Sequence, residues 1–388
     1  MSARLLLFDL YSGGHHRSYL EMLARAWVTG PDRGLMEIAA PEELFETHED
    51  FRRWIEVQDR ARLAAVPVSL DAPLREGDLG LTDVLRNDLL HGRVLRSLTR
   101  ERRPAHVLAM FVDHLQASLA LRRTGPCPVS GIYFRPSFHY PGEPRSTRIR
   151  KRLLLRAAMS NPRLHRLLSL DPYAAETLGD PRVVWLPDGV DTSAFGESPT
   201  QIRARWGVEP DRRVLLFFGV VSARKGIHEV LAALPLVQAP VTLVIAGRVP
   251  REERLPIEEA VARARTESPV PIVQDDRYVR DEEIQDLFGA SDAALVAYRR
   301  HVGSSNVLIR AAAAGVPVVG PSYGLMARHI GVHHLGLSVD PSSAPALASA
   351  VDRVLSGDSG FDAGAAQAFS EANSVRAFTD RVFREVLV

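Results

Sequence analysis

The sequence predicts an α/β protein of two Rossmann-like domains, each with a parallel sheet, facing each other across a central cleft. Short apolar runs alternate with helical segments along the chain, a pattern typical of parallel sheets covered by helices on both faces. The length of 388 residues exceeds one typical core and favours two domains. A stretch rich in turn-forming residues, Pro187–Pro199, separates the two halves of the alternation. Ligands of such sheets bind beyond the carboxyl ends of the strands, so we expect the site in the loops there.

Residues 1–190 are expected to form the N-terminal domain. Its first strand is the apolar run Leu5–Phe8, which is followed by the loop YSGGHH. The adjacent glycines of that loop suit a close approach of the backbone to a ligand. The helix after the loop carries four apolar residues on one face, Tyr19, Leu20, Leu23 and Trp27. Further strands are predicted at His106–Phe111, Val129–Phe134, Leu167–Leu170 and Val183–Leu186.

Residues 191–365 are expected to form the C-terminal domain, and residues 366–388 a last segment with a helix over Ser374–Val388. Asp292 opens a buried strand, and we interpret it as a structural hydrogen-bond acceptor rather than a base. The strands of this domain are predicted at Val214–Phe218, Val241–Ala246, Ile272–Val273, Ala293–Ala297 and Val318–Val319.

Composition excludes several classes of protein. A net charge of +1 argues against bulk attraction to nucleic acid. The single cysteine, Cys127, excludes an intramolecular disulfide framework and a cysteine-based metal cluster. No run approaches the roughly 18 apolar residues that a membrane span needs, and the N-terminus is too short and too acidic at Asp9 for a secretory signal. We therefore expect a soluble, cytoplasmic protein that binds no nucleic acid. The oligomeric state has no signature in the sequence.

The most informative segment is a basic loop between two buried strands. Lys225 is one of only two lysines in a chain with 48 basic Lys and Arg side chains, and it follows Arg224 in the loop GVVSARKG. A loop that feeds a helix N-terminus favours an anion, and the two cations add charge and donors suited to a phosphate or diphosphate. The alternative is that both are solvated loop cations. The loop lacks the spacing of a dinucleotide site and the ending of a P-loop, which argues against a dehydrogenase or an NTPase.

The motifs of residues 210–330 resemble family four of the retaining glycosyltransferases, which have the GT-B fold. The resemblance rests on FFGVVSARKG…LVIAG together with DEEIQDLFGASDAALVAY…GSSNVLIRAAAAGVPVVG, and more weakly on GGHH and SGIYFRPSFHY in the first half. It implies transfer of a sugar from a nucleotide-diphosphate donor with retention of configuration and without a metal or other cofactor. It also implies that the C-terminal domain holds the donor, that the N-terminal domain holds a small-molecule or lipid-like acceptor, and that the final helix crosses back to the first domain.

Carrying the family pattern over gives the candidate site residues. The predicted donor-binding residues are Gly14, Gly219, Arg224, Lys225, Gly247, Gly303, Ser304, Ser305, Asn306 and Arg310. Arg224, Lys225 and the N-termini of the two helices that begin at these residues would stabilise charge on the departing diphosphate. The predicted acceptor-binding residues are His15, His16 and Arg135, and the catalytic candidates are His139 and His114. For each of these histidines the alternative is a structural role. In this family the usual explanation of retention is front-face attack, with the donor phosphate helping to deprotonate the acceptor.

The sequence departs from the family at three positions. Val220 stands where the family usually has Arg, and Val302 and Arg310 stand where it has the two glutamates of a Glu-x7-Glu motif. No Asp or Glu lies between Asp292 and Asp340, whereas that stretch holds several Arg and His. Because this stretch is basic, we expect the protein to bind the donor more through its phosphates than through its ribose, or the sugar or the acceptor to carry a negative group. Alternatively, Arg310 points to solvent or pairs with a distant acid, or donor chemistry has been lost. The rival function is thus a non-catalytic nucleotide-sugar-binding protein.

A basic amphipathic helix is predicted at residues 145–156. Arg145, Arg148, Arg152 and Arg156 recur at helical spacing with apolar residues between them. Such a helix suits peripheral contact with the anionic inner face of a membrane, as fits a lipid-like acceptor. The alternative is a solvated helix. Aromatic residues do not alternate with these arginines, which argues against binding of single-stranded nucleic acid.

Overall fold

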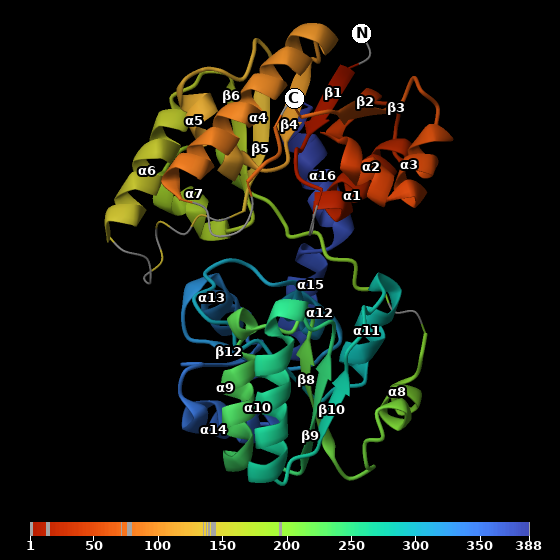
Figure 1. Ribbon diagram of the computed structural model, residues 1–388, viewed down its shortest axis with the longest axis vertical. Helices are drawn as coiled ribbons and strands as arrows, with labels where there is room; N and C mark the ends of the chain where they lie inside the picture. The colour runs from red at the N-terminus through yellow and green to blue at the C-terminus, as the bar shows by residue number, and fades with distance from the viewer. Residues whose placement is uncertain are drawn as a thin grey trace. The chain divides into compact units, whose positions relative to one another are not determined.

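The chain forms two compact units, shown in Figure 1. The computed structural model describes residues 3–12, 16–70, 72–75, 80–134, 136, 138, 140, 145–193 and 196–387. Unit 1 comprises Met1–His139, Glu143–Gly189 and Val375–Val388, and unit 2 comprises Tyr140–Gly142 and Val190–Ser374. The segment 366–388, predicted as one piece, is therefore divided between the units at Ser374.

Unit 1 is built on a seven-stranded sheet in which every strand pair is parallel, in the order β3-β2-β1-β4-β5-β6-β7. β2 and β3 are additional to the predicted strands. β2 carries the buried Glu37, which interrupts its apolar run and pairs with Arg4 and Arg102. β3 contains Pro67, a residue that usually argues against a strand. The strands are β1 (Ala3–Phe8), β2 (Gly34–Pro41), β3 (Leu63–Val68), β4 (His106–Ala109), β5 (Val129–Tyr133), β6 (Leu164–Ser169) and β7 (Val183–Trp185).

Two apolar clusters cover the two faces of this sheet. On one face α1 buries Tyr19, Leu20, Leu23 and Trp27, as its spacing predicts, together with α2, α3 and α16. The other face is covered by α4, α5, α6 and α7. The helices of unit 1 are α1 (His16–Thr29), α2 (Glu42–Thr47), α3 (Glu49–Glu56), α4 (Leu81–Arg102), the 3₁₀ turn η1 (Val112–His114), α5 (Gln116–Ala120), α6 (Arg145–Met159), α7 (Pro172–Leu178) and α16 (Val375–Val386).

The last helix, α16, belongs to the core of unit 1. The ring of Phe383 lies 5.5 Å from that of Trp27, and the ring of Phe378 lies 5.2 Å from that of Tyr19. Both phenylalanines are buried, so α16 supplies part of the apolar surface that holds α1 on the sheet.

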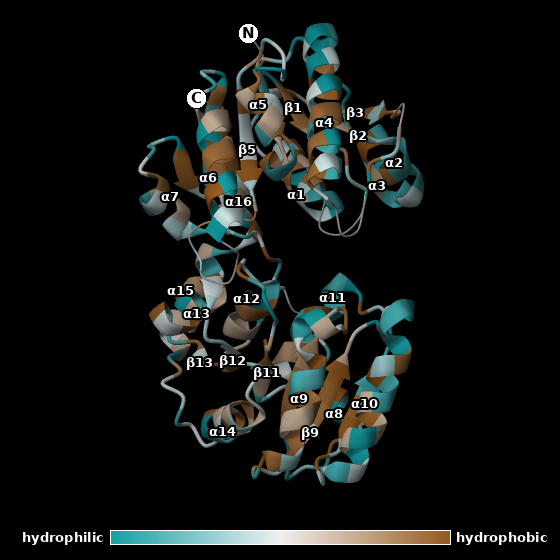
Figure 2. Cartoon of the chain, turned by 60° about the vertical axis from the view of Figure 1, so that its left-hand side comes forward, coloured by the Kyte–Doolittle hydropathy of each residue, from teal (hydrophilic) through white to brown (hydrophobic). Residues whose placement is uncertain are grey.

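Unit 2 is built on a six-stranded parallel sheet in the order β10-β9-β8-β11-β12-β13. In Figure 2 its strands β8 and β9 are strongly hydrophobic, whereas α10 is largely hydrophilic. β13 is additional to the predicted strands. The strands are β8 (Arg213–Phe218), β9 (Val241–Ala246), β10 (Ile272–Asp275), β11 (Ala293–Leu295), β12 (Val318–Pro321) and β13 (Gly336–Val339).

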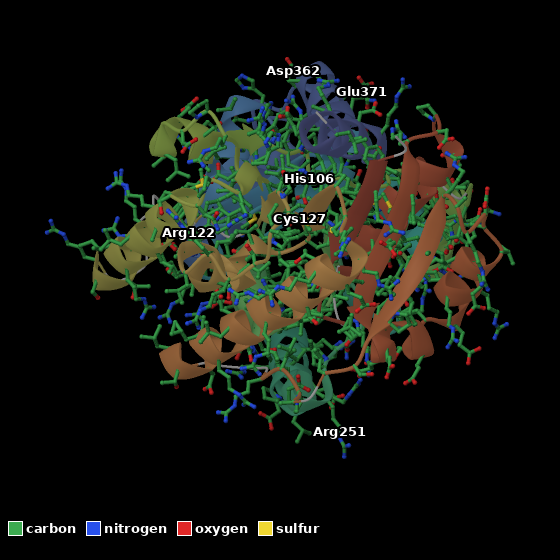
Figure 3. The ribbon with its side chains drawn as sticks, turned by 90° about the horizontal axis from the view of Figure 1, so that it is seen from above. His106, Arg122, Cys127, Arg251, Asp362 and Glu371 are labelled. Carbon is green, nitrogen blue, oxygen red and sulfur yellow. The ribbon has the colours of Figure 1, made fainter. Side chains whose placement is uncertain are left out.

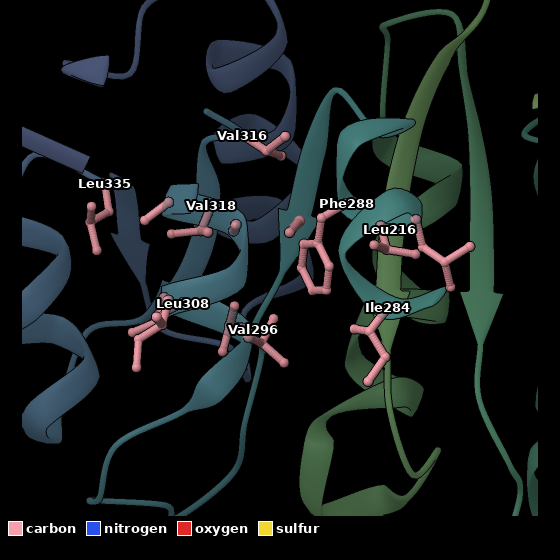
Figure 4. Close-up of a cluster of buried hydrophobic side chains, with 14 of the residues drawn as sticks. Leu216, Ile284, Phe288, Val296, Leu308, Val316, Val318 and Leu335 are labelled. Atoms are coloured by element: carbon pink, nitrogen blue, oxygen red, sulfur yellow. The ribbon is translucent and has the colours of Figure 1, made fainter. Parts of the chain in front are cut away.

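The helices of unit 2 lie on both faces of its sheet. Residues of α9, α10 and α14 form the apolar cluster on one face, and residues of α8, α11, α12, α13 and α15 form the cluster on the other, part of which is drawn in Figure 4. The helices are α8 (Pro199–Arg205), η3 (Ala223–Lys225), α9 (Ile227–Ala233), η4 (Leu234–Leu236), η5 (Arg251–Glu253), α10 (Arg254–Glu267), α11 (Asp281–Gly289), α12 (Asn306–Ala313), α13 (Gly324–Val332), α14 (Ala344–Leu355) and α15 (Ala363–Ala372).

Asp292 fixes the start of β11 to β8. Its carboxylate accepts hydrogen bonds from Arg203, Arg213 and the backbone N–H of Val214, at 2.7, 2.9 and 2.7 Å. The predicted structural role of Asp292 is confirmed.

Among the described helices, none is long and apolar enough to cross a membrane.

Candidate functional site

The basic loop of unit 2 lies at the carboxyl end of β8, as predicted. Gly219 and Gly247 follow β8 and β9 and have φ angles of 101° and 134°, which favour glycine. A Cβ at Gly247 would stand 2.2 Å from the carbonyl oxygen of Gly219, and a Cβ at Gly219 would stand 2.3 Å from Nζ of Lys225. Gly219 therefore leaves room for the ammonium of Lys225, and Gly247 lets the backbone of Gly219 approach it closely. Their predicted role in holding the donor stays a prediction.

Lys225 is fixed by the backbone and by an aromatic ring. Its Nζ donates to the carbonyl oxygen of Phe218 at 3.0 Å and lies 5.4 Å from the centre of the Tyr298 ring. The guanidinium of Arg224 lies 5.9 Å from the same ring. An ammonium has three donors, so the bond to Phe218 leaves donors of Lys225 for a ligand. The neighbouring N–H of Ala223 already binds a carboxylate, that of Glu253, at 2.5 Å.

Tyr298 connects this loop to the second predicted donor segment. Ser305 Oγ donates to Tyr298 Oη at 3.2 Å, and Tyr323 Oη donates to the carbonyl oxygen of Tyr298 at 2.5 Å. In the same segment, His301 Nε2 lies 3.0 Å from the carbonyl oxygen of Ser304. The structure thus brings Arg224, Lys225 and Ser305 around one tyrosine that the sequence analysis did not name.

The helix α12 begins at Asn306, directly after Gly303, Ser304 and Ser305. Its N-cap residue, Ser305, makes no side-chain hydrogen bond to the helix. The first N–H groups of a helix have no intrahelical partner. In α12 the N–H of Leu308 donates to the carbonyl oxygen of Ser305 at 3.0 Å. The two N–H groups before it are not satisfied by the Ser305 side chain and remain suited to an oxyanion.

Arg310 is buried in unit 2, so the alternative that it points to solvent is wrong. Only 9% of the residue is exposed, and its buried Nη1 has no hydrogen-bond partner among the described residues. Desolvation lowers the pKa of its guanidinium, while attraction to Asp281 and Asp191 opposes the shift. A buried unpaired donor costs free energy unless a ligand or water satisfies it. This side chain therefore remains a candidate for ligand binding.

Unit 1 holds a second group of polar side chains at the carboxyl ends of β1 and β4. We call it the histidine cluster. The ring centres of three imidazoles lie within 5.4 Å of the centre of the Tyr11 ring. The members of the cluster are Asp9, Tyr11, His16, His91, Phe111 and His114.

Within the cluster, Asp9 and His16 form a carboxylate–imidazole pair. Asp9 Oδ2 lies 2.7 Å from His16 Nδ1, and Asp9 Oδ1 accepts the N–H of Tyr11 at 3.1 Å. The ring of His16 stacks on Phe111 with 3.9 Å between ring centres. The Asp9 side chain is 1% exposed and that of His16 is 15% exposed. The acid is thus buried, and the imidazole above it remains accessible.

His91 and His114 complete the cluster. His91 Nδ1 lies 2.8 Å from the carbonyl oxygen of Asn87, and burial lowers the pKa of its imidazole. The predicted catalytic candidate His114, in η1, lies 4.7 Å from Tyr11 between ring centres. The structure therefore brings together His16 and His114, which are almost a hundred residues apart in the chain, beside the unpredicted Asp9 and His91. Gly14, His15, Arg135 and His139 lie outside the described residues.

The described residues include no group of three or more His, Cys, Asp or Glu side chains arranged to hold a metal ion.

Comparison with known proteins finds sequence similarity within unit 2. Residues 212–357 match the family model described as glycosyl transferases group 1. The glycosyltransferase TuaC of Bacillus subtilis, named for teichuronic acid biosynthesis, is 28% identical over 172 residues, which are 43% of this chain and 40% of that protein. An uncharacterized glycosyltransferase of Methanocaldococcus jannaschii is 29% identical over 173 residues, 44% of this chain and 43% of that protein. The chain thus matches less than half the length of these relatives.

Solved structures match the whole chain. Sucrose-phosphate synthase from Thermosynechococcus elongatus superposes with a TM-score of 0.71 at 16% identity, covering 98% of both chains. Anabaena HepE, solved in complex with UDP and glucose, superposes with a TM-score of 0.66 at 17% identity, also over 98% of both chains. The chain has the GT-B fold. Its two units are the two Rossmann-like domains of that fold, and the segment similar to group 1 glycosyl transferases lies within the second of them.

Proposed function

We propose that this GT-B protein is a glycosyltransferase that moves a sugar from a nucleotide-diphosphate donor to a small-molecule or lipid-like acceptor. The observation that carries the proposal is the position of Lys225, held at the carboxyl end of β8 by Phe218 and Tyr298 inside the segment similar to group 1 glycosyl transferases. A fixed ammonium there stabilises the charge that develops on a departing diphosphate.

Arg224, the open N-terminus of α12 and the unpaired Nη1 of Arg310 support a donor site in the same unit. Each offers donors to phosphate or sugar oxygens. HepE, a protein of the same fold, was solved with UDP, and we take uridine diphosphate as the first nucleotide to test.

Retention of the anomeric configuration and independence from metals are part of the proposal. Both follow from the resemblance of the basic loop and of the α12 segment to family four. Val302 and Arg310 replace the two family glutamates, so ribose contacts are expected to differ from those of the family, with Arg310 donating where a carboxylate would accept. Loss of one charged hydrogen bond weakens binding by about 1.5–3 kcal/mol, which does not forbid turnover.

The experiment is a release assay with a panel of UDP-, GDP- and dTDP-sugars, in which the nucleoside diphosphate is measured. Lys225→Ala is expected to lower donor affinity or turnover by roughly tenfold or more, the loss expected for one charged contact. The chain offers a matched control, because its one other lysine, Lys151, lies on α6 of unit 1. Lys151→Ala should leave donor binding unchanged.

An unchanged rate in Lys225→Ala would remove the diphosphate role of this residue. Nucleotide binding without any release of nucleoside diphosphate, across the whole panel, would instead favour the rival non-catalytic binding protein. Proton NMR of the sugar product distinguishes retention from inversion.

Helix α6 is the candidate surface for peripheral membrane contact. Ile149 and Leu153, one turn apart, are 51% and 59% exposed, and the helix carries six cations and no acidic residue. Basic amphipathic helices bind anionic lipid through apolar burial and charge together. Co-sedimentation with phosphatidylglycerol vesicles is expected, with phosphatidylcholine vesicles as the control. Ile149→Ser combined with Leu153→Ser should abolish it, and equal binding to both lipids would contradict the contact.

A further inference from the structure

The hydroxyl of Tyr298 holds an unused hydrogen-bond donor in a buried position. Tyr298 and Ser305 are 6% and 7% exposed, and Ser305 Oγ donates to Tyr298 Oη at 3.2 Å. A phenolic hydroxyl also carries one O–H of its own. In the described part of the chain, the O–H of Tyr298 has no acceptor. A buried donor of this kind costs free energy unless a ligand or water accepts from it.

The neighbouring hydroxyl, that of Tyr323, is by contrast fully used. It accepts the N–H of Arg300 at 2.7 Å and donates to the carbonyl oxygen of Tyr298 at 2.5 Å. The N–H of Tyr298 in turn donates to the carbonyl oxygen of Val296 at 2.8 Å. The backbone of Tyr298 is thus held on both sides, so its ring and hydroxyl are in place before any ligand binds.

Two cations lie beside the ring of the same tyrosine. Nζ of Lys225 and the guanidinium carbon of Arg224 are 5.4 and 5.9 Å from its centre, within the range at which an aromatic ring attracts a cation. Neither cation forms an ion pair with a carboxylate among the residues that the structure describes. Glu229, in the first turn of α9, pairs instead with Arg299 at 3.1 Å. Two neighbouring cations without an acidic partner favour an anionic ligand.

We propose that Tyr298 is a binding residue for the diphosphate of the donor. The inference rests on the proposed function, and all the residues that it uses belong to unit 2. The O–H of Tyr298 donates to an oxygen of the diphosphate, and the Tyr298 ring positions Lys225 for the same group. The matching ligands are pyrophosphate and nucleoside diphosphates, whereas a nucleoside without phosphates makes none of these contacts.

The test uses the full-length protein with three probes, namely UDP, inorganic pyrophosphate and uridine. Tyr298→Phe keeps the ring and removes the hydroxyl, so its affinity for UDP and for pyrophosphate should fall about tenfold or more, the loss of one hydrogen bond to a charged group. Tyr298→Leu also removes the ring and should lose about a further threefold. Calorimetry measures both affinities. Tyr173→Phe, on α7 of unit 1, is the matched control and should bind all three probes as the wild type does.

Uridine and a double variant distinguish this role from a merely structural one. Binding of uridine, followed by NMR, should be the same in the wild type and in both Tyr298 variants. In the background of Lys225→Ala, the difference between Tyr298→Phe and Tyr298→Leu should vanish, because the ring acts through the lysine. Equal losses of uridine and UDP in the variants, or wild-type affinity for UDP in both of them, would overturn the assignment.

A measurement without any nucleotide separates failure of this inference from failure of the proposed function. The chain has only two lysines, so lysine labelled with carbon-13 at Cε gives two signals, which Lys151→Arg assigns. The ring of Tyr298 should shift the Lys225 signal upfield in the wild type and in Tyr298→Phe but not in Tyr298→Leu, and pyrophosphate should move this signal alone. An unshifted Lys225 signal contradicts the positioning role.

The binding results then divide the two hypotheses. If the wild type binds pyrophosphate through Tyr298 but binds none of the nucleotides, the proposed function fails and the diphosphate subsite stands. If the wild type binds UDP and the Tyr298 variants bind it equally well, the inference fails alone. Both fail if the wild type binds neither UDP nor pyrophosphate.

Discussion

His106 makes the stability of unit 1 sensitive to mild acid. This residue opens β4, and its labelled side chain is seen from above in Figure 3. Its Nε2 lies 2.9 Å from Ser130 Oγ, and its ring centre lies 5.5 Å from that of His165. Burial, together with the neighbouring His165, lowers the pKa of His106 from 6.5 to about 4.

The sign of the effect follows from proton binding. Between about pH 4 and 6.5 the unfolded chain binds a proton at this residue and the folded chain does not. The contribution of neutral His106 to the free energy of unfolding of unit 1 is therefore fully present above pH 6.5 and is lost as the pH falls towards 4. The full shift corresponds to about 3 kcal/mol. Between pH 7.5 and 5.5 linkage gives about 1.4 kcal/mol, which partial solvent access reduces to roughly 1 kcal/mol.

The assay is urea unfolding at both pH values, followed by tryptophan fluorescence. Three of the four tryptophans, Trp27, Trp54 and Trp185, lie in unit 1, so the signal reports mainly on that unit. His106→Gln does not titrate, and its side chain still offers a donor to Ser130. The variant should lose about 1 kcal/mol less than the wild type when the pH is lowered. An identical pH dependence in both proteins would refute the reasoning.

Three further outcomes are expected. A Cβ at Gly226, where φ is 83°, would stand 1.9 Å from the carbonyl oxygen of Ala297. In thermal unfolding, Gly226→Ala should therefore destabilise unit 2 by about 3 kcal/mol or more. Gly357 has the same φ and open space around it, so Gly357→Ala should cost only about 1 kcal/mol. Asp292→Ala should cost about 2–3 kcal/mol in the same measurement, because it leaves the N–H of Val214 and two arginines without their acceptor. Arg310→Glu should change the preference among UDP-, GDP- and dTDP-sugars by roughly tenfold, one charged contact; unchanged affinity and selectivity would place Arg310 outside the site.

The sequence was sufficient where one physical signal decided the structure. The short, mostly apolar run Val241–Ala246, rich in β-branched residues, predicts a buried strand, and β9 has these bounds. The sequence does not predict β2 and β3 because Glu37 and Pro67 interrupt that signal. In β2, the buried Glu37 is paired with Arg4 and Arg102, contacts that depend on the tertiary structure.

For the candidate sites too, the sequence predicts what neighbouring residues determine and does not predict what tertiary contacts determine. The basic loop could be predicted because its residues are neighbours in the chain. The partnership of Asp9 with His16 depends on where a loop returns, and the proximity of His91 depends on how α4 packs. The one signal for this pair in the sequence is a polar residue directly after a buried strand, as Asp9 is.

The division of the chain at Gly189 and Ser374 determines the order in which the two units can be completed during synthesis. Residues 190 and 374 are bridged side by side, and the backbone N–H of Val190 donates to the carbonyl oxygen of Asn373 at 2.9 Å. α16, which follows directly, carries Phe378 and Val382, both completely buried. During translation, all of unit 2 is therefore synthesised before α16, the last helix of unit 1. Until then, the apolar face of unit 1 that α16 covers stays exposed, and chaperones protect nascent chains with such exposed surface from aggregation.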